Sequence, residues 1–283
     1  MANNPSLEVV EGKVAVKPKT LSQVFLKVLK RDSTFNVVNV FFALVLWTIV
    51  ATIVNSPFVP TPVKVWKATW RLIQFGDVEG FTLAKHITAS IIRILAGFGL
   101  SCVLGIPLGI FMGLYPKVYA RTRAVIEPIR FIPPIAWIPM SIVILVGFSR
   151  YVFLIWLGAF FPIWINTLVG VGRVNQVYMN VAKVFGGDKK TRVTKIVVPS
   201  VMPDITSGMR VGLGMAWMCI VAAEMIGGEA VGIGRLILKY AELLQLAPVI
   251  SGMLIIGVIG FLMNEILLIV EKRMFKWRWE VSL

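Results

Sequence analysis

Residues 180–217, NVAKVFGGDKKTRVTKIVVPSVMPDITSGMRVGLGMAW, determine how the rest of the chain is interpreted. The stretch begins as a short amphipathic segment, breaks at Gly186-Gly187 and turns strongly basic. It then passes Pro199 and Pro203 before it enters an apolar helix. Two adjacent glycines permit a sharp turn between two short helices. The stretch therefore predicts a polar, folded loop that leads into a membrane-embedded helix.

The composition indicates an integral membrane protein. Of the 283 residues, 57% are hydrophobic and only 15% are charged, and the mean hydropathy is +0.83, well above the usual range of soluble domains. The net charge of +15 would favour nucleic acid binding in a soluble protein. Here basic residues flank apolar segments, as they do on the cytoplasmic side of membrane helices, so no nucleic acid partner is expected.

Six apolar stretches are long enough to cross a bilayer, whose hydrocarbon core is about 30 Å thick. The sequence therefore predicts an all-α, multi-pass fold. Most lysines and arginines fall on the side of the two termini, which predicts that both are cytoplasmic. The predicted spans are 34–54, 86–114, 124–147, 151–172, 204–227 and 248–270.

The segments around these spans complete the predicted organisation. Residues 1–33 form a cytoplasmic leader with an amphipathic helix at 21–31, residues 34–275 form the membrane domain, and residues 276–283 form a cytoplasmic tail. Residues 115–124 are expected to be a short basic loop, and residues 173–203 a longer cytoplasmic one. Between the first two spans, VKVWKATWRLIQ has the pattern of an amphipathic surface helix.

Two spans carry further signals. The 86–114 span has a small residue at every fourth position, which gives it a flat stripe for close approach by another helix. The 124–147 span contains four prolines, so it is expected to be bent or interrupted and to face protein or water. The stripe consists of Gly97, Ser101, Gly105, Gly109 and Gly113, and the prolines are Pro128, Pro133, Pro134 and Pro139.

The spacing within 180–203 resembles the EAA loop of ABC importer permeases. In that family a Glu-Ala-Ala segment is followed by a glycine, by a proline thirteen residues later and by another four beyond. Ala182, Gly186, Pro199 and Pro203 stand at these spacings, whereas Asn180-Val181 replaces the leading Glu-Ala. The segments 86–114, 132–139 and 207–228 look like the nitrate, sulfonate, taurine and bicarbonate branch of the family, and the similarity covers roughly residues 34–275.

The resemblance implies a type I importer permease in the inner, cytoplasmic membrane. Two copies would form the pore for a small anion, sulfonate or taurine first, with nitrate or bicarbonate as the alternative. Separate ATPase subunits would use ATP and Mg, and an extracytoplasmic binding protein would deliver the substrate. This chain would hold no cofactor or metal and would not be an enzyme; it has no GxxxxGK[ST] phosphate loop. The implied ATPase-coupling residues are Asn180, Val181, Ala182, Val184, Phe185, Gly186, Gly187, Pro199 and Pro203.

Charged residues within membrane spans are hypotheses about function by default. Arg210 is expected either to attract an oxyanion or to pair with Glu265 or with helix-end carbonyls. Arg93 is expected to reach the outer surface, to line an outer vestibule, or to have a structural role. Arg130 is read as an inner-surface anchor. The full set of pore or substrate candidates is Arg93, Arg130, Pro133, Pro134, Trp137, Arg210, Trp217 and Glu224.

Glu224 closes the fifth span just before Gly227-Gly228. Its expected role is structural: to cap the 228–240 segment or to pair with Arg235. The alternative is a functional role, in which residues 224–234 act as a gate. Trp137 and Trp217 are read as packing residues, with Trp217 as a residue that could narrow the pore.

Two other classes of function compete with the importer permease. A channel or secondary transporter would need no ATPase, but it would leave the 173–203 loop without a role, and no matching pair of interrupted helices is visible. An intramembrane enzyme lacks support, because no span holds a Ser/His, paired Asp or His/Glu constellation. Cys102 and Cys219 lie within apolar runs and are read as packing residues without a disulfide.

Overall fold

The computed structural model describes residues 9–10, 13–14 and 21–274. The chain divides into two compact units, residues 1–62 and 63–283. Most of the predicted leader before residue 21 and the whole predicted tail at 276–283 lie outside the described residues.

The first unit is mainly one long helix. The strands β1 (Val9–Val10) and β2 (Lys13–Val14) pair antiparallel, and α1 (Leu21–Val54) follows. The sequence predicts a surface helix at 21–31 and a separate span at 34–54, whereas α1 is continuous through both, because no glycine or proline separates them. The helix ends at Val54, and the following Asn55 has a φ of 44°, in the left-handed region that asparagine tolerates.

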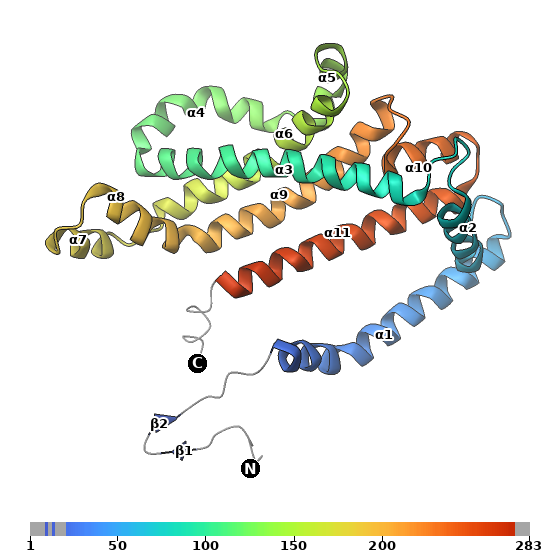
Figure 1. The fold of residues 1–283 in the computed structure, drawn as a ribbon, viewed down its shortest axis with the longest axis horizontal. Coiled ribbons are helices and arrows are strands. Elements are labelled where there is room, and N and C mark those ends of the chain that lie inside the picture. The colour runs from blue at the N-terminus through green and yellow to red at the C-terminus, as the bar shows by residue number, and fades with distance from the viewer. Residues whose placement is uncertain (1–8, 11–12, 15–20, 275–283) are drawn as a thin grey trace. The chain divides into compact units, whose positions relative to one another are not determined.

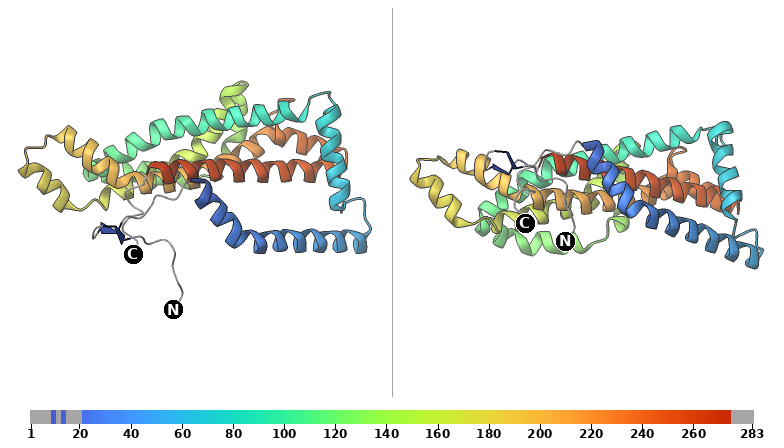
Figure 2. Two further views of the ribbon diagram at one scale, coloured as in Figure 1. Left: turned by 60° about the horizontal axis from the view of Figure 1, so that its bottom comes forward. Right: turned by 90° about the horizontal axis from the view of Figure 1, so that it is seen from below.

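The second unit is a bundle of long helices (Figure 1). In both further views α3, α6 and α9 run alongside one another (Figure 2). Ile94, Ile155 and Ile220, one from each of these helices, are completely buried where the three meet. The elements are α2 (Pro62–Phe75), α3 (Leu83–Leu114), α4 (Pro116–Phe131), η1 (Pro134–Trp137), α5 (Ile138–Ile144), α6 (Phe148–Gly172), α7 (Gln176–Val184), α8 (Lys189–Arg192), η2 (Val193–Val197), α9 (Val198–Ile226), α10 (Ile233–Glu242) and α11 (Leu246–Met274).

The small-residue stripe of α3 is the contact surface for α6. A Cβ atom added at Gly97 would lie 2.6 Å from the Cβ of Ile155, and one at Gly113 would lie 2.5 Å from the Cβ of Val171. The hydroxyl of Ser101 donates to the carbonyl of Trp156 across the same interface, at 3.1 Å. These contacts confirm the predicted close approach of another helix, and that helix belongs to the same chain. On α9, Gly208 and Gly212 face α6 in the same way.

The proline-rich third span is broken, as the sequence predicts. The helices Pro116–Phe131 and Pro134–Ile144 meet at an angle of 85°. Ile132 and Pro133 have extended backbones at the break, because a residue that precedes a proline is disfavoured in the helical region. The expected basic loop at 115–124 is wrong: α4 begins at Pro116, a residue whose fixed φ suits the first turn of a helix.

Four helices of the described part are long and apolar enough to cross a membrane: 83–114, 148–172, 189–226 and 246–273. The bent pair makes a fifth, and Val38–Val54 is a shorter apolar helix. The all-α fold predicted for a multi-pass protein is therefore confirmed, and each of the six predicted spans corresponds to one of these elements. The fifth span starts earlier than the predicted residue 204, because η2 and α9 continue the helix from α8 without a break.

The polar elements gather at the two ends of the second unit. The helices α7 and α8 form one end, and α2 and α10 lie at the other (Figure 1). Figure 2 shows that α2 runs across the direction of the long helices. The two ends are therefore separate candidate interaction surfaces.

Candidate functional site

The turn after α7 requires glycine at residue 186. Gly186 has φ +74°, and its N–H donates to the carbonyl of Lys183 at 3.0 Å. The N–H of Gly187 reaches back to the carbonyl of Ala182 at 2.8 Å. These two bonds make a Schellman motif, in which a left-handed residue satisfies the last carbonyls of a helix. The predicted break at Gly186-Gly187 is confirmed, and it has this physical cause.

The turn exposes apolar side chains. Val184 and Phe185 are 85% and 86% exposed, and Val181 on the same helix is half exposed. Apolar side chains exposed together in this way mark an interaction surface. The structure therefore places these three predicted coupling residues where another protein can reach them.

Basic residues surround this surface. Asp188 is the single acidic residue of the 173–203 segment, against six lysines and arginines. Its carboxylate caps α8 by accepting the N–H of Thr191 at 2.9 Å. Hydrogen bonding to the side chain of Thr191, and then to its N–H, lowers the pKa of Asp188. The carboxylate of Asp188 is thus engaged within the turn, and the outward face of the segment is strongly positive.

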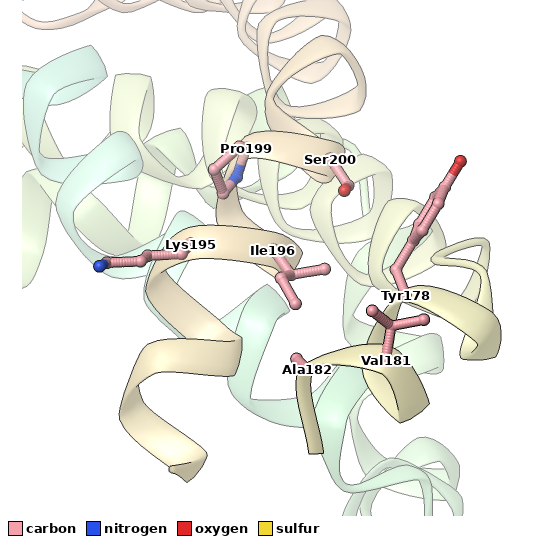
Figure 3. A pocket seen from close by; sticks show the side chains of 7 residues that line it. All are labelled: Tyr178, Val181, Ala182, Lys195, Ile196, Pro199 and Ser200. Atoms are coloured by element: carbon pink, nitrogen blue, oxygen red, sulfur yellow. The ribbon is translucent and has the colours of Figure 1, made fainter. Parts of the chain in front are cut away.

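A groove of about 390 Å³ lies between α7 and the start of α9 (Figure 3). It joins two motif residues, Ala182 and Pro199, that are far apart in sequence. Pro203 lies further along, inside α9, and does not line the groove. The lining residues are Tyr178, Val181, Ala182, Lys195, Ile196, Pro199 and Ser200.

The 173–203 segment is also tied to the membrane helices. The ammonium group of Lys189 donates to the hydroxyl of Tyr115 and lies 4.8 Å from the centre of its ring. Tyr115 joins the end of α3 to the start of α4. A displacement of α8 would therefore act directly on the junction that leads into the broken span.

Glu224 lies in a buried polar network at the opposite end of the bundle. Its carboxylate accepts from Arg93 Nη1 at 2.8 Å, from the hydroxyl of Ser90 at 2.8 Å, and from the N–H of Gly234 at 2.9 Å. The expected capping contact, to the first turn of α10, is present. The charge partner is Arg93, which corrects the expected pairing with Arg235.

Arg93 is likewise held inside the protein. Its Nη2 lies 2.7 Å from the carboxylate of Glu229, its Nη1 also donates to the carbonyl of Val231 at 2.8 Å, and its guanidinium stacks 4.1 Å from the ring centre of Tyr151. Of the roles expected for Arg93, the structural one matches these contacts.

Arg210 forms an ion pair across α9 and α11. Its partner is Glu271, whereas the sequence suggested Glu265, six residues earlier on the same helix. Glu265 and Glu271 both lie on α11, and only the structure decides which one reaches Arg210. Arg93 and Arg210 are thus both paired with carboxylates.

Arg130 differs from the other two arginines. Among the residues that the structure describes, it has no carboxylate partner; its guanidinium lies 5.0 Å from the ring centre of Phe131. It lines a cavity of about 390 Å³ beside the break in the third span, together with Pro134 and Asn166. The cavity wall is otherwise apolar and comes from α4, α6 and α9.

The two candidate tryptophans are packed against other side chains, and Pro133 lies at the break in the third span. Trp217 is 7% exposed and belongs to the central core, and Trp137 packs edge-on against Phe153 at 6.5 Å between ring centres. Pro133 forms the break itself and does not line the cavity. These contacts agree with a packing role for both tryptophans.

The sequence reasoning missed several members of the polar network. His86 and Ser90 precede Arg93 at helical spacing and continue the stripe that starts at Gly97, so the periodicity of α3 contained a signal for them. The ion pair between Asp77 and Lys239, at 2.7 Å, joins segments 162 residues apart and had no local signal. In the described parts of the chain, no three His, Cys, Asp or Glu residues are grouped as metal ligands.

Comparison with known proteins identifies the family. Residues 105–276 match the model of the family described as "Binding-protein-dependent transport system inner membrane component". The chain is 32% identical to the taurine transport system permease protein of Escherichia coli (strain K12), over 90% of this chain and 93% of that protein. It is 35% identical to the nitrate import permease protein of Synechocystis sp., over 81% of this chain and 84% of that one.

Other relatives are named for aliphatic sulfonates in Bacillus subtilis and for bicarbonate in Synechococcus elongatus. Among solved structures, a chain of the MetNI methionine ABC transporter in an inward facing conformation has the same fold. The TM-score is 0.54 at 16% identity, over 66% of this chain and 95% of that one. The chain therefore belongs to the binding-protein-dependent transport system inner membrane component family, the permease subunits of ABC transporters.

Proposed function

We propose that the chain forms the pore of an ATP-driven importer of a small anion in the cytoplasmic membrane, with taurine or another sulfonate as the first candidate. Nitrate and bicarbonate are the alternatives. The names of relatives support this class of substrate, because four of those reported above name taurine, nitrate, aliphatic sulfonates and bicarbonate.

The observation that carries the proposal is the exposed apolar turn at Val184 and Phe185. In our proposal these side chains seat in a groove of a separate ATPase, which binds ATP and Mg. The Schellman turn at Gly186 fixes their direction, and α8 passes the motion to Tyr115 through Lys189. An uncoupled channel or secondary transporter would have no use for this surface.

Arg130 is the side chain that we propose to meet the anion. Arg93 and Arg210 already have carboxylate partners, and an arginine without one has its charge-assisted hydrogen bonds available for an oxyanion. The cavity that Arg130 lines lies beside the broken span, where freed backbone carbonyls must face protein or water. This location agrees with the expectation that the proline-rich span is interrupted and faces protein or water.

Three partners complete the proposed assembly. A second copy of the chain would form the other half of the pore, an ATPase would bind the 173–203 segment on each copy, and an extracytoplasmic binding protein would deliver the anion. This arrangement requires both termini and the 173–203 segment to be cytoplasmic.

The test is transport by the reconstituted complex. The permease is expressed with the ABC ATPase proposed as its partner, and the two are expected to purify together. Proteoliposomes that contain the complex and the binding protein should then take up labelled taurine, nitrate or bicarbonate only with ATP and Mg. Uptake that follows an ion gradient without the ATPase would contradict the proposal, and competition by neutral or cationic solutes alone would contradict the substrate class.

A further inference from the structure

The helix α2 has three distinct faces. Val65 and Leu72 are buried, and between them the hydroxyl of Thr69 donates to that of Ser251 on α11 at 2.9 Å. These contacts fix how α2 is rotated on the bundle. The two remaining faces of the helix are therefore presented in a defined direction.

One of these faces is aromatic and exposed. Trp66, Trp70 and Ile73 recur at helical spacing and are 69%, 51% and 52% exposed. The helix runs across the direction of the long apolar helices, at the end of the bundle remote from α7 and α8 (Figure 2). A helix that crosses the spans at their end and exposes tryptophans is placed at the membrane–water interface, where tryptophan is enriched.

The third face is basic and borders a cavity. Lys67, Arg71 and Phe75 are spaced four residues apart on one side of α2, and all three are exposed. Together with Tyr240 and Gln245 they line a cavity of about 440 Å³. The cavity thus has two cations and an exposed aromatic ring along one wall.

The acidic residues nearby do not neutralise these cations. Asp77, which also lines the cavity, is 2.7 Å from the ammonium group of Lys239, and Glu79 is 2.8 Å from the same group. The other oxygen of Asp77 accepts the N–H groups of Glu79 and Phe81. In the described part of the chain, Lys67 and Arg71 form no ion pair, so the cavity favours an anion.

We propose that this cavity binds the phosphate headgroup of an anionic phospholipid, such as phosphatidylglycerol, in the leaflet at this end of the bundle. Lys67 and Arg71 hold the phosphate, Tyr240 and Gln245 line the same cavity, and the acyl chains lie along the face formed by Trp66, Trp70 and Ile73. A soluble anion would use the cations but not the aromatic face. The proposal does not depend on what the protein transports.

The test measures bound lipid on the full-length permease. Phosphatidylglycerol is titrated onto the purified protein in detergent, and the complex is counted by native mass spectrometry. We expect the double variant Lys67→Gln/Arg71→Gln to weaken binding about tenfold or more, because each basic residue near a membrane surface contributes to the attraction of anionic lipid. Lys67 and Arg71 are both exposed, so they can be replaced without disturbing the core.

Two further variants and one ligand sharpen the result. Lys117→Gln/Arg121→Gln removes two exposed basic residues at the same spacing on α4. Neither residue lines the cavity, so this variant loses only general attraction of anionic lipid and should bind within about twofold of wild type. Trp66→Ser/Trp70→Ser should weaken phosphatidylglycerol binding, and inorganic phosphate should not compete with the lipid. Unchanged binding by Lys67→Gln/Arg71→Gln would overturn the proposal, as would equal loss in the α4 variant. Competition by inorganic phosphate, with no effect of the tryptophan changes, would show a soluble-anion site and would overturn it too.

Discussion

Arg93 on α3 and Glu224 on α9 form an ion pair, with 2.8 Å between Nη1 and Oε1, and their side chains are only 6% and 1% exposed. The pair joins two of the three central helices, and Glu224 also holds the start of α10 through the N–H of Gly234. This ion pair thus fixes the end of the bundle opposite the 173–203 segment. Each helix buries a charged side chain that depends on its partner on the other helix.

Removing one partner of this pair should destabilise the protein strongly. Arg93→Leu leaves the Glu224 carboxylate buried without a cation, and breaking a buried pair costs about 3–5 kcal/mol. The free energy of unfolding in detergent measures the loss. Arg173→Leu is the control, because Arg173 is 72% exposed in its pair with Asp204 and exposed pairs contribute about 0–1 kcal/mol. Equal stability of the two variants would contradict the structural role of Arg93.

Gly109, in the small-residue stripe of α3, should tolerate no side chain because α6 approaches it closely. A Cβ at Gly109 would lie 2.7 Å from the Cβ of Thr167 and 2.8 Å from the carbonyl oxygen of Trp164, which cannot rotate away. Gly109→Ala should therefore destabilise by about 1–3 kcal/mol. Gly99→Ala, in the same helix but with no atom within 4 Å, should be neutral or stabilise by up to about 1 kcal/mol. Thermal unfolding of both variants tests this, and a destabilised Gly99→Ala would count against the assigned packing.

The Asp77–Lys239 pair should make stability depend on acidity. Burial acts to raise the pKa of Asp77, but the bonds from Lys239 and from the N–H groups of Phe81 and Glu79 outweigh it and lower that pKa below 3.8. The folded-state pKa is thus depressed, so the stabilisation is complete above the pKa of the unfolded chain and is lost as the pH falls through the lower folded value. Wild type should exceed Asp77→Asn in stability at pH 7, and the difference should shrink below about pH 4.

His86 and Glu79 also face this pair, with His86 Nε2 3.4 Å from the Asp77 carboxylate and the Glu79 carboxylate 2.8 Å from the Lys239 ammonium group. Thermal unfolding of both proteins between pH 7 and pH 3 gives the comparison, and the Asp77→Asn background removes only the contribution of Asp77. A difference that grows as the pH falls would contradict the predicted sign.

Arg130 should control the affinity for the anion. Arg130→Gln removes the charged donor at the cavity beside Pro134, and the loss of a hydrogen bond to a charged group, about 1.5–3 kcal/mol, should raise the KM of uptake about tenfold or more. Arg123→Gln is the control, since Arg123 is 62% exposed and pairs with Glu127 on the same helix. If the two variants transport with equal KM, the anion does not meet Arg130 at this cavity.

Periodicity and spacing predicted much of the fold. The small residues from Gly97 to Gly113 indicated a close helix contact, and the structure shows α6 in that place. The glycine pair at 186–187 indicated the turn, because only a residue free to adopt positive φ closes a Schellman motif. These signals are local, so they can be read from sequence.

Charge pairing could not be predicted in the same way. Arg93 and Glu224 are 131 residues apart, and Glu265 and Glu271 are both on the helix that Arg210 faces. Which carboxylate lies within reach depends on the rotation and height of packed helices, which no local pattern records. The same reason explains why the groove that joins Ala182 to Pro199 was not foreseen from the motif that contains both.

The coupling role of the 173–203 segment is tested most directly by ATP-driven uptake in proteoliposomes that contain the permease, its ATPase and the binding protein. Gly186 has φ +74° and donates its N–H to Lys183; proline can do neither, whereas asparagine tolerates the left-handed region. Gly186→Pro should abolish ATP-dependent uptake and leave the thermal unfolding of the membrane helices unchanged, while Gly186→Asn should retain most of the uptake. ATP-driven uptake by Gly186→Pro at the wild-type rate would contradict the account.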